Sequence, residues 1–174
     1  MTIPTRSFLD WLSNKTKYNN KISLDRVTGL FASQNGNATL FCYTTKFYEN
    51  GDLYNYLDRV NPDRNASISL CTQILQRVAE LHKMGYASTD FKPANVLVDS
   101  NTRLVLSDLE SFVPSQPVNV RQSTFCYEHY FKNTAHLNKI SNYNVDASSV
   151  ARTLYYIIFR QICRHVEPLH VDLN

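Results

Sequence analysis

The sequence predicts a mixed α+β fold, with a β-rich N-terminal portion followed by a mainly helical C-terminal portion. Two observations lead to this prediction. Short apolar runs separated by turns rich in Asn and Gly occupy residues 26–47, whereas apolar side chains recur at spacings of three and four in residues 67–83 and 146–163. With 174 residues, 43% of them hydrophobic, the chain is long enough to build one domain around a real core.

The first predicted elements are one helix and one β-hairpin. Residues 7–17 predict a short helix, because apolar side chains follow helical spacing after a suitable N-cap residue, Ser7. Residues 26–32 and 38–47 predict the two strands of a hairpin, because the turn-forming residues of the Gln-Asn-Gly-Asn segment separate them.

The C-terminal portion is predicted to combine two helices with a second hairpin. Residues 67–83 form a helix that Gly85 ends, and residues 146–163 form a helix so apolar that we expect it to lie centrally. Residues 96–98 and 104–106 predict two short strands around a polar turn. The first of these helices is predicted to bury a stripe of six side chains: Ile68, Cys71, Ile74, Leu75, Val78 and Leu81.

Composition argues against several classes of partner. The 18 Lys and Arg residues nearly balance the 15 Asp and Glu residues, so we expect neither nucleic acid nor an anionic membrane as a partner. The longest apolar run, residues 154–162, is much shorter than the ~20 residues of a membrane span, and we expect a cytoplasmic location, which includes the inside of a host cell. The four dispersed cysteines predict buried, reduced thiols.

One part of the chain contains recognisable chemistry. Residues 88–98 read Ser-Thr-Asp-Phe-Lys-Pro-Ala-Asn-Val-Leu-Val, and residues 107–110 read Ser-Asp-Leu-Glu. Asn95 lies 5 residues after Asp90, and Asp108 lies 13 residues after Asn95. In both motif and spacing, these residues resemble the catalytic loop and the metal-binding motif of eukaryotic-type protein kinases.

The resemblance extends over residues 25–163 and implies a protein kinase-like fold reduced at both ends. Residues 1–45 would form a truncated, β-rich N-lobe, and residues 46–52 would form the hinge. Residues 53–174 would form a shortened, mainly helical C-lobe that lacks the family's last helices.

The resemblance also implies an ATP site beside the hinge. Thr45 corresponds to the gatekeeper residue, and the backbone of Lys46 to Tyr48 would face the adenine edge. Asp52 would face the ribose, and Leu97 would pack beneath the adenine. ATP and Mg²⁺ are therefore the implied cofactors.

Phosphoryl transfer requires a proton acceptor, a cation near the transferred phosphate and oxygen ligands for Mg²⁺. The resemblance gives these roles to Asp90 as the base, to Lys92 as the cation, and to Asn95 and Asp108 as the metal ligands. Lys92 is typical of the Ser/Thr-specific branch of the family. Asp146 corresponds to the residue that holds the catalytic-loop backbone.

The sequence departs from the kinase pattern where ATP would be gripped. The first glycine is Gly29, so no glycine-rich phosphate loop is present, and Glu49 is the single glutamate of the first fifty residues. Ser88 and Thr89 replace the family's His-Arg, and residues 108–110 read Asp-Leu-Glu instead of Asp-Phe-Gly. ATP binding is therefore expected to be weak or to depend on a partner.

These departures favour a regulatory pseudokinase, or decoy, that binds a signalling protein such as a full-length kinase or its substrate. Self-association into a homodimer through the exposed face of the truncated lobe belongs to the same reading. An active minimal Ser/Thr protein kinase, which transfers the ATP γ-phosphate to a protein hydroxyl, is the alternative. An unrelated α+β interaction domain is the third hypothesis.

Overall fold

The computed structural model describes residue 25 and residues 27–36, 38–88, 90–108, 111–114 and 142–161. Within these residues the chain has a mixed α+β structure, with three α-helices, a 3-10 turn and three two-stranded antiparallel sheets. The helix expected at residues 7–17 lies outside the described residues.

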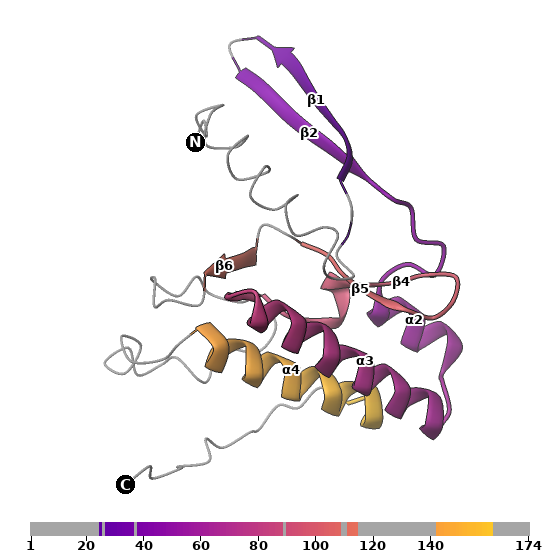
Figure 1. Cartoon of the computed structure of the whole chain (residues 1–174). Helices are drawn as coiled ribbons and strands as arrows, with labels where there is room; N and C mark the ends of the chain where they lie inside the picture. The colour runs from indigo at the N-terminus through magenta and orange to yellow at the C-terminus, as the bar shows by residue number, and fades with distance from the viewer. Residues whose placement is uncertain are drawn as a thin grey trace, which may run out of the picture.

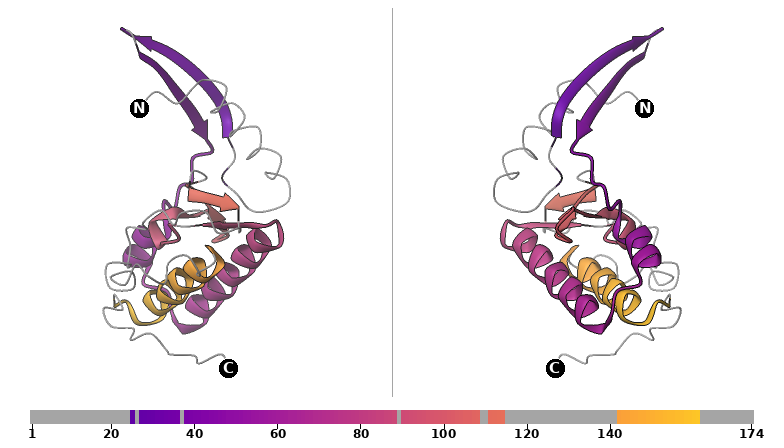
Figure 2. Two further views of the ribbon diagram at one scale, coloured as in Figure 1. Left: turned by 90° about the vertical axis from the view of Figure 1, so that its left-hand side faces the viewer. Right: turned by 90° about the vertical axis from the view of Figure 1, so that its right-hand side faces the viewer.

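The N-terminal hairpin pairs β1 (Val27–Asn35) with β2 (Ala38–Thr45) and extends away from the helices in every view (Figures 1 and 2). Asn35 is paired with Ala38, so the turn is tight, and Gly36 takes the left-handed φ of 59° that such a turn requires. The predicted hairpin is confirmed, although β2 ends at Thr45, before the predicted end of the strand.

Two helices follow the hairpin, and an aspartate begins each of them. Asp52 caps α2 (Leu53–Val60) by accepting a hydrogen bond from the Asn55 backbone N–H at 2.8 Å. Asp63 caps α3 (Arg64–Lys83) in the same way, through the Ala66 N–H at 2.8 Å. Both carboxylates satisfy donors that a helix start would otherwise leave unpaired.

The buried face of α3 differs from the predicted stripe. Ile68 and Leu75 are 47% and 52% exposed, so their predicted burial is wrong, whereas Cys71 is half-buried and packs against the core. The buried residues of α3 are Ser67, Leu70, Ile74, Val78 and Leu81. The helix is rotated relative to the prediction, so that Leu70, 1% exposed, takes the place of Ile68 and Leu75 in the core. Ser67 lies on the same face and donates to the Pro62 carbonyl.

The remaining elements surround the segment between α3 and α4. A short strand, β3 (Tyr86–Ser88), pairs with β6 (Phe112–Pro114), and β4 (Val96–Val98) pairs with β5 (Leu104–Leu106). A 3-10 turn, η1 (Pro93–Asn95), leads into β4. The β4–β5 hairpin was predicted, whereas the β3–β6 pair was not.

The last described helix, α4 (Asn142–Phe159), packs against α3 and β3 (Figure 1). Val145, Val150 and Ile157 are buried, but Ile158 is 44% exposed, so the helix buries one face only and is less central than predicted. Cys42 is exposed, which corrects its expected burial, while Cys126 and Cys163 lie outside the described residues.

The core lies beneath the small sheets, where α2, α3 and α4 meet β4 and β5. Its fully buried side chains are Leu53, Leu57, Leu70, Ile74, Leu81, Val96, Val98, Leu104, Leu106 and Ile157. No helix within the described ranges is both long enough and apolar enough to span a bilayer.

The contrast between adjacent residues of α3 tests this core. Ile74 is 0% exposed, so Ile74→Ala should lower the free energy of unfolding by about 2–5 kcal/mol, through lost burial and a residual cavity. Leu75→Ala, at a 52% exposed position, should change it by less than about 1 kcal/mol. Urea unfolding followed by circular dichroism measures both, and equal losses would contradict the helix orientation.

Candidate functional site

Three polar residues from two separate segments meet at the start of β4 and the end of β5. The Asn95 side-chain amide donates through Nδ2 to Oδ2 of Asp108 at 3.1 Å and to Oδ2 of Asp90 at 3.3 Å. The same nitrogen lies 2.9 Å from the Asp90 carbonyl oxygen. Asn95 therefore joins the two carboxylates that the sequence predicts to act together.

Local structure explains why these residues converge. Phe91 and Pro93 are buried, which fixes the loop on the core on both sides of Lys92. Asn95 ends η1, and its carbonyl oxygen accepts hydrogen bonds from the N–H of Ser107 at 3.0 Å and from its hydroxyl at 2.9 Å. The pairing of β4 with β5 thus brings residues 95 and 107 together, and Asp108 follows directly.

Asp108 has an unusual backbone conformation. Its φ is 56°, in the left-handed region that residues with a Cβ rarely adopt. Such a conformation costs about 1–3 kcal/mol and persists only where the surroundings hold it. The strain is located at the residue whose carboxylate is directed toward Asn95, which marks Asp108 as a functional candidate.

The charges of this cluster are partly balanced. Lys92 Nζ lies 2.6 Å from Oδ2 of Asp90, and both side chains are about one-fifth exposed, at 22% and 21%. Lys92 neutralises the Asp90 carboxylate, so the negative charge of Asp108 remains uncompensated by Lys92. Such a site attracts a cation and, next to Lys92, an anionic group.

The donor set fits Mg²⁺ better than it fits a transition metal. Within the described ranges, no group of three His, Cys, Asp or Glu side chains comes together as a metal site. Mg²⁺, however, typically takes one or two carboxylates and fills its other positions with water or phosphate oxygens. The half-buried Asp108 carboxylate and the Asn95 amide oxygen are the groups that would hold it.

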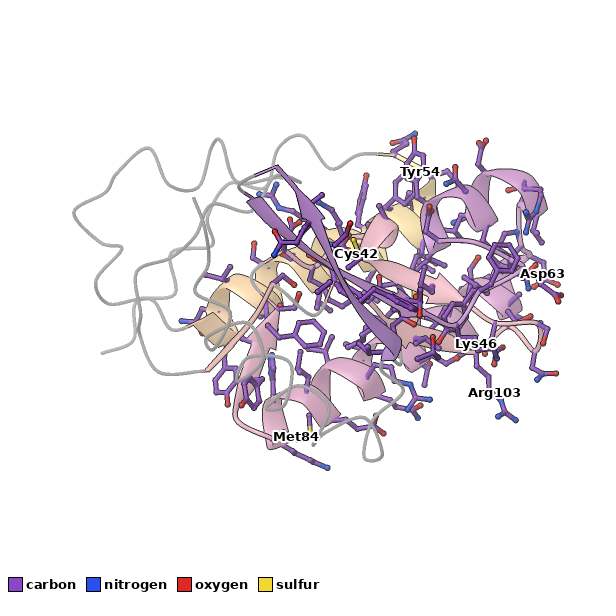
Figure 3. The ribbon with its side chains drawn as sticks, turned by 90° about the horizontal axis from the view of Figure 1, so that it is seen from above. Cys42, Lys46, Tyr54, Asp63, Met84 and Arg103 are labelled. Carbon is purple, nitrogen blue, oxygen red and sulfur yellow. The ribbon has the colours of Figure 1, made fainter. Side chains whose placement is uncertain are left out.

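The predicted adenine-side residues lie on the connection between the hairpin and α2. Thr45 ends β2 and is half-buried, whereas Lys46 is exposed beneath the hairpin (Figure 3). The Lys46 ammonium lies 5.5 Å from the centre of the Tyr48 ring, within cation–π distance. The Tyr48 carbonyl accepts the Gly51 N–H at 2.9 Å, which closes the turn before α2.

Asp52 and Leu97 are neighbours, although the sequence separates them by 45 positions. They form an isolated antiparallel β-bridge, and the Val98 N–H donates to the Gly51 carbonyl at 2.9 Å. Both Asp52 oxygens are engaged by Asn55, through its backbone N–H at 2.8 Å and its side-chain amide at 2.7 Å. Asp52 therefore serves as a helix cap here, while Leu97 is half-buried.

Asp146 connects α4 to the loop that carries Asp90. Its Oδ2 accepts the Ser88 N–H at 2.8 Å, which confirms that Asp146 holds the backbone of this loop. His82, at the end of α3, places Nε2 2.9 Å from the same oxygen, and the Tyr143 hydroxyl donates to the His82 carbonyl at 3.0 Å. Burial raises the pKa of Asp146, although the His82 and Ser88 hydrogen bonds oppose this shift.

Sequence reasoning missed three contributors to the site. The sequence marks Ser88 only as a departure from the kinase pattern and gives no signal for His82 or Ser111. The Ser111 hydroxyl donates to the Asp108 carbonyl at 2.8 Å and lies 3.2 Å from the Ser88 hydroxyl oxygen. Only the β3–β6 pairing brings Ser88 and Ser111 together, and no apolar periodicity signals it.

The chain matches no family model.

The raised pKa of Asp146 gives a pH test. Because the folded state binds this proton more tightly than the unfolded state, the contribution of Asp146 to stability is present at low pH. It is lost as pH rises from the ordinary Asp value of 3.8 through the raised pKa. Asp146→Asn should remove this part of the pH dependence, while Asp58→Asn, at an exposed position, should not.

Urea unfolding of the three proteins from pH 4 to pH 8 measures the difference. The free energy of unfolding of Asp146→Asn minus that of wild type should increase as pH rises, because only the wild type loses stability with the Asp146 proton. A constant difference across this range would contradict a raised pKa at Asp146.

Proposed function

We propose that the chain is a protein kinase-like phosphotransferase, which binds Mg²⁺–ATP at Asn95 and Asp108 and transfers the γ-phosphate to a protein hydroxyl. The observation that carries this proposal is the junction of Asp90, Asn95 and Asp108 through one amide nitrogen, at 2.9–3.3 Å. Asn95 and Asp90 precede Asp108 by 13 and 18 positions in the sequence. The η1 turn and the β4–β5 hairpin bring all three residues together.

Further contacts support the same assignment. Asp146 binds the backbone of Ser88, two residues before Asp90, as the resemblance implies for the kinase helical lobe. Leu97 is bridged to Asp52, at the end of the connection that carries Lys46 and Tyr48, so the proposed adenine-side residues lie on neighbouring segments.

The proposed mechanism uses each side chain of the cluster once. An acceptor Ser or Thr hydroxyl loses its proton to the Asp90 carboxylate as its oxygen forms the new bond to the γ-phosphorus. The bond between the γ-phosphorus and the bridging oxygen breaks, and ADP leaves. Lys92 would neutralise charge on the transferred phosphate, while Asn95 and Asp108 would hold the Mg²⁺ that offsets charge on the phosphate oxygens.

A metal-dependent change in thermal stability tests the nucleotide site. Mg²⁺ and ATP together should raise the unfolding midpoint of the wild type, because binding stabilises only the folded state. Asp108→Ala should abolish the metal-dependent part of this rise, whereas the exposed Asp58→Asn control should keep it. A wild-type midpoint that does not respond to Mg²⁺–ATP would contradict the proposal.

Transfer from radiolabelled ATP to a generic basic protein tests the chemistry. Asp90→Asn should lower the rate by about 10²–10⁴-fold, because it removes the proton acceptor and leaves the amide cluster nearly isosteric. Its Mg²⁺–ATP affinity should not fall, because Asn95 and Asp108 remain in place and Lys92 is released from its bond to the Asp90 carboxylate. Equal rates for wild type and Asp90→Asn would show that Asp90 is not the base.

A second candidate function is regulatory, namely binding of another signalling protein without transfer. It is favoured by one face of the β1–β2 hairpin, on which Phe31 is 58% exposed, Leu40 is 50% exposed and Cys42 is exposed. The register places Phe31 opposite Cys42 and Leu40 opposite Ser33, so the three apolar side chains share this face. Residues 27–45 contain no charged residue and no proline, the features that usually protect exposed strands.

Kinase inhibition separates the regulatory function from catalysis. If the hairpin face binds a full-length Ser/Thr kinase, adding the protein to a panel of such kinases should inhibit a member. Phe31→Ser with Leu40→Ser should weaken that inhibition by at least about tenfold, as loss of hot-spot side chains does. Asp108→Ala should retain it, and so should Leu75→Ser, at a similarly exposed apolar position on α3. Inhibition that survives the hairpin substitutions would exclude this face.

A further inference from the structure

We propose that Ser111 is a positioning residue for Asp108 and that Ser88 completes the arrangement. Their hydroxyls form a hydrogen-bond relay that holds Asp108 in the conformation required for metal binding. The inference rests on the proposed function, because it concerns how the Mg²⁺–ATP site is held in place.

The direction of the relay follows from the protons available. Ser111 donates its hydroxyl proton to the Asp108 carbonyl at 2.8 Å, and its backbone N–H donates to the same oxygen at 3.0 Å. A serine hydroxyl has one proton. The 3.2 Å bond between the two hydroxyl oxygens must therefore use the proton of Ser88. Ser88 donates to Ser111, and Ser111 donates to Asp108.

The relay begins at a rigid part of the molecule. Ser88 is 3% exposed, and its backbone N–H donates to the buried Asp146 carboxylate at 2.8 Å. Ser88 is also paired with Phe112 across β3 and β6. The donor that orients Ser111 is thus fixed by both α4 and a strand.

The two sides of Asp108 are held by different partners. On the preceding side, the Ser107 N–H and hydroxyl bind the Asn95 carbonyl at 3.0 and 2.9 Å. On the following side, Ser111 binds the Asp108 carbonyl, whose direction is set by the ψ angle of Asp108. Together they maintain the left-handed φ of 56° and direct the carboxylate to Asn95, 3.1 Å away.

Removal of the Ser111 hydroxyl leaves the Asp108 carbonyl held by the Ser111 N–H alone, which should loosen the following side of this clamp. Asp108 can then return to an ordinary negative φ, which turns its carboxylate away from Asn95. Ser111 is only half-buried, so this change should affect the metal site far more than the core.

The experiment measures ATP affinity by titration calorimetry with Mg²⁺ and, separately, with EDTA. Ser111→Ala should weaken binding of Mg²⁺–ATP about tenfold, which corresponds to the loss of one well-placed hydrogen bond. Ser88→Ala should weaken it by about threefold, because Ser111 keeps its own bond to Asp108. Ser111→Thr, which retains a hydroxyl, should stay close to wild type. ATP affinity in EDTA should remain unchanged in all variants.

The matched control is Ser69→Ala, at an exposed position of α3, which should behave as wild type. A merely structural role of Ser111 would lower affinity equally with and without Mg²⁺ and would overturn the inference. Wild-type affinity of Ser111→Ala for Mg²⁺–ATP would also overturn it, while the proposed function would stand. If the wild type itself shows no Mg²⁺-dependent affinity, the proposed function fails and this inference fails with it.

Discussion

The hydrogen bonds of the buried Asp146 carboxylate are the interactions on which the packing of α4 against α3 and β3 depends. Asp146 is fully buried, and its Oδ2 joins α4 to the end of α3 through His82 and to β3 through Ser88. A carboxylate removed from water is costly unless such partners compensate it. Burial raises its pKa despite these bonds, and its other oxygen has no hydrogen-bond partner within the described part of the chain. The candidate site is thus held by a carboxylate whose burial carries a desolvation cost.

Asp146 is connected to the candidate site through backbone groups and short serine side chains, and not through long side chains. Ser88 connects to Ser111 and hence to Asp108, while Ser107 connects to Asn95. Short side chains with one or two rotatable bonds lose little entropy when they are ordered. A cluster built in this way is positioned before any ligand arrives, and preorganisation of this kind is the main source of electrostatic stabilisation in enzymes.

Periodicity and turn chemistry predicted the order of the elements but not every contact. The β1–β2 and β4–β5 hairpins and the two long helices follow from local patterns that tertiary packing did not override. The predicted face of α3 was partly wrong because two apolar stripes share Ile74, Val78 and Leu81, and the structure buries Leu70 instead of Ile68 and Leu75. The meeting of Asp90, Asn95 and Asp108 was expected from the resemblance to the kinase catalytic loop, whose motif and spacing they share. The Ser88–Ser111 contact was not, because three-residue strands carry no periodic signal.

The two sides of the proposed ATP site are organised differently, and this difference bears on affinity. The phosphate side already satisfies its own polar groups, since Asn95 and Lys92 bind the neighbouring carboxylates at 2.6–3.3 Å. A phosphate entering near Lys92 must replace part of its bond to Asp90, so only the difference between the old and the new contacts contributes to binding. On the adenine side, Asp52 is already engaged by Asn55 and Lys46 is exposed. These contacts of the protein with itself are the physical reason why the proposed site is expected to bind ATP weakly.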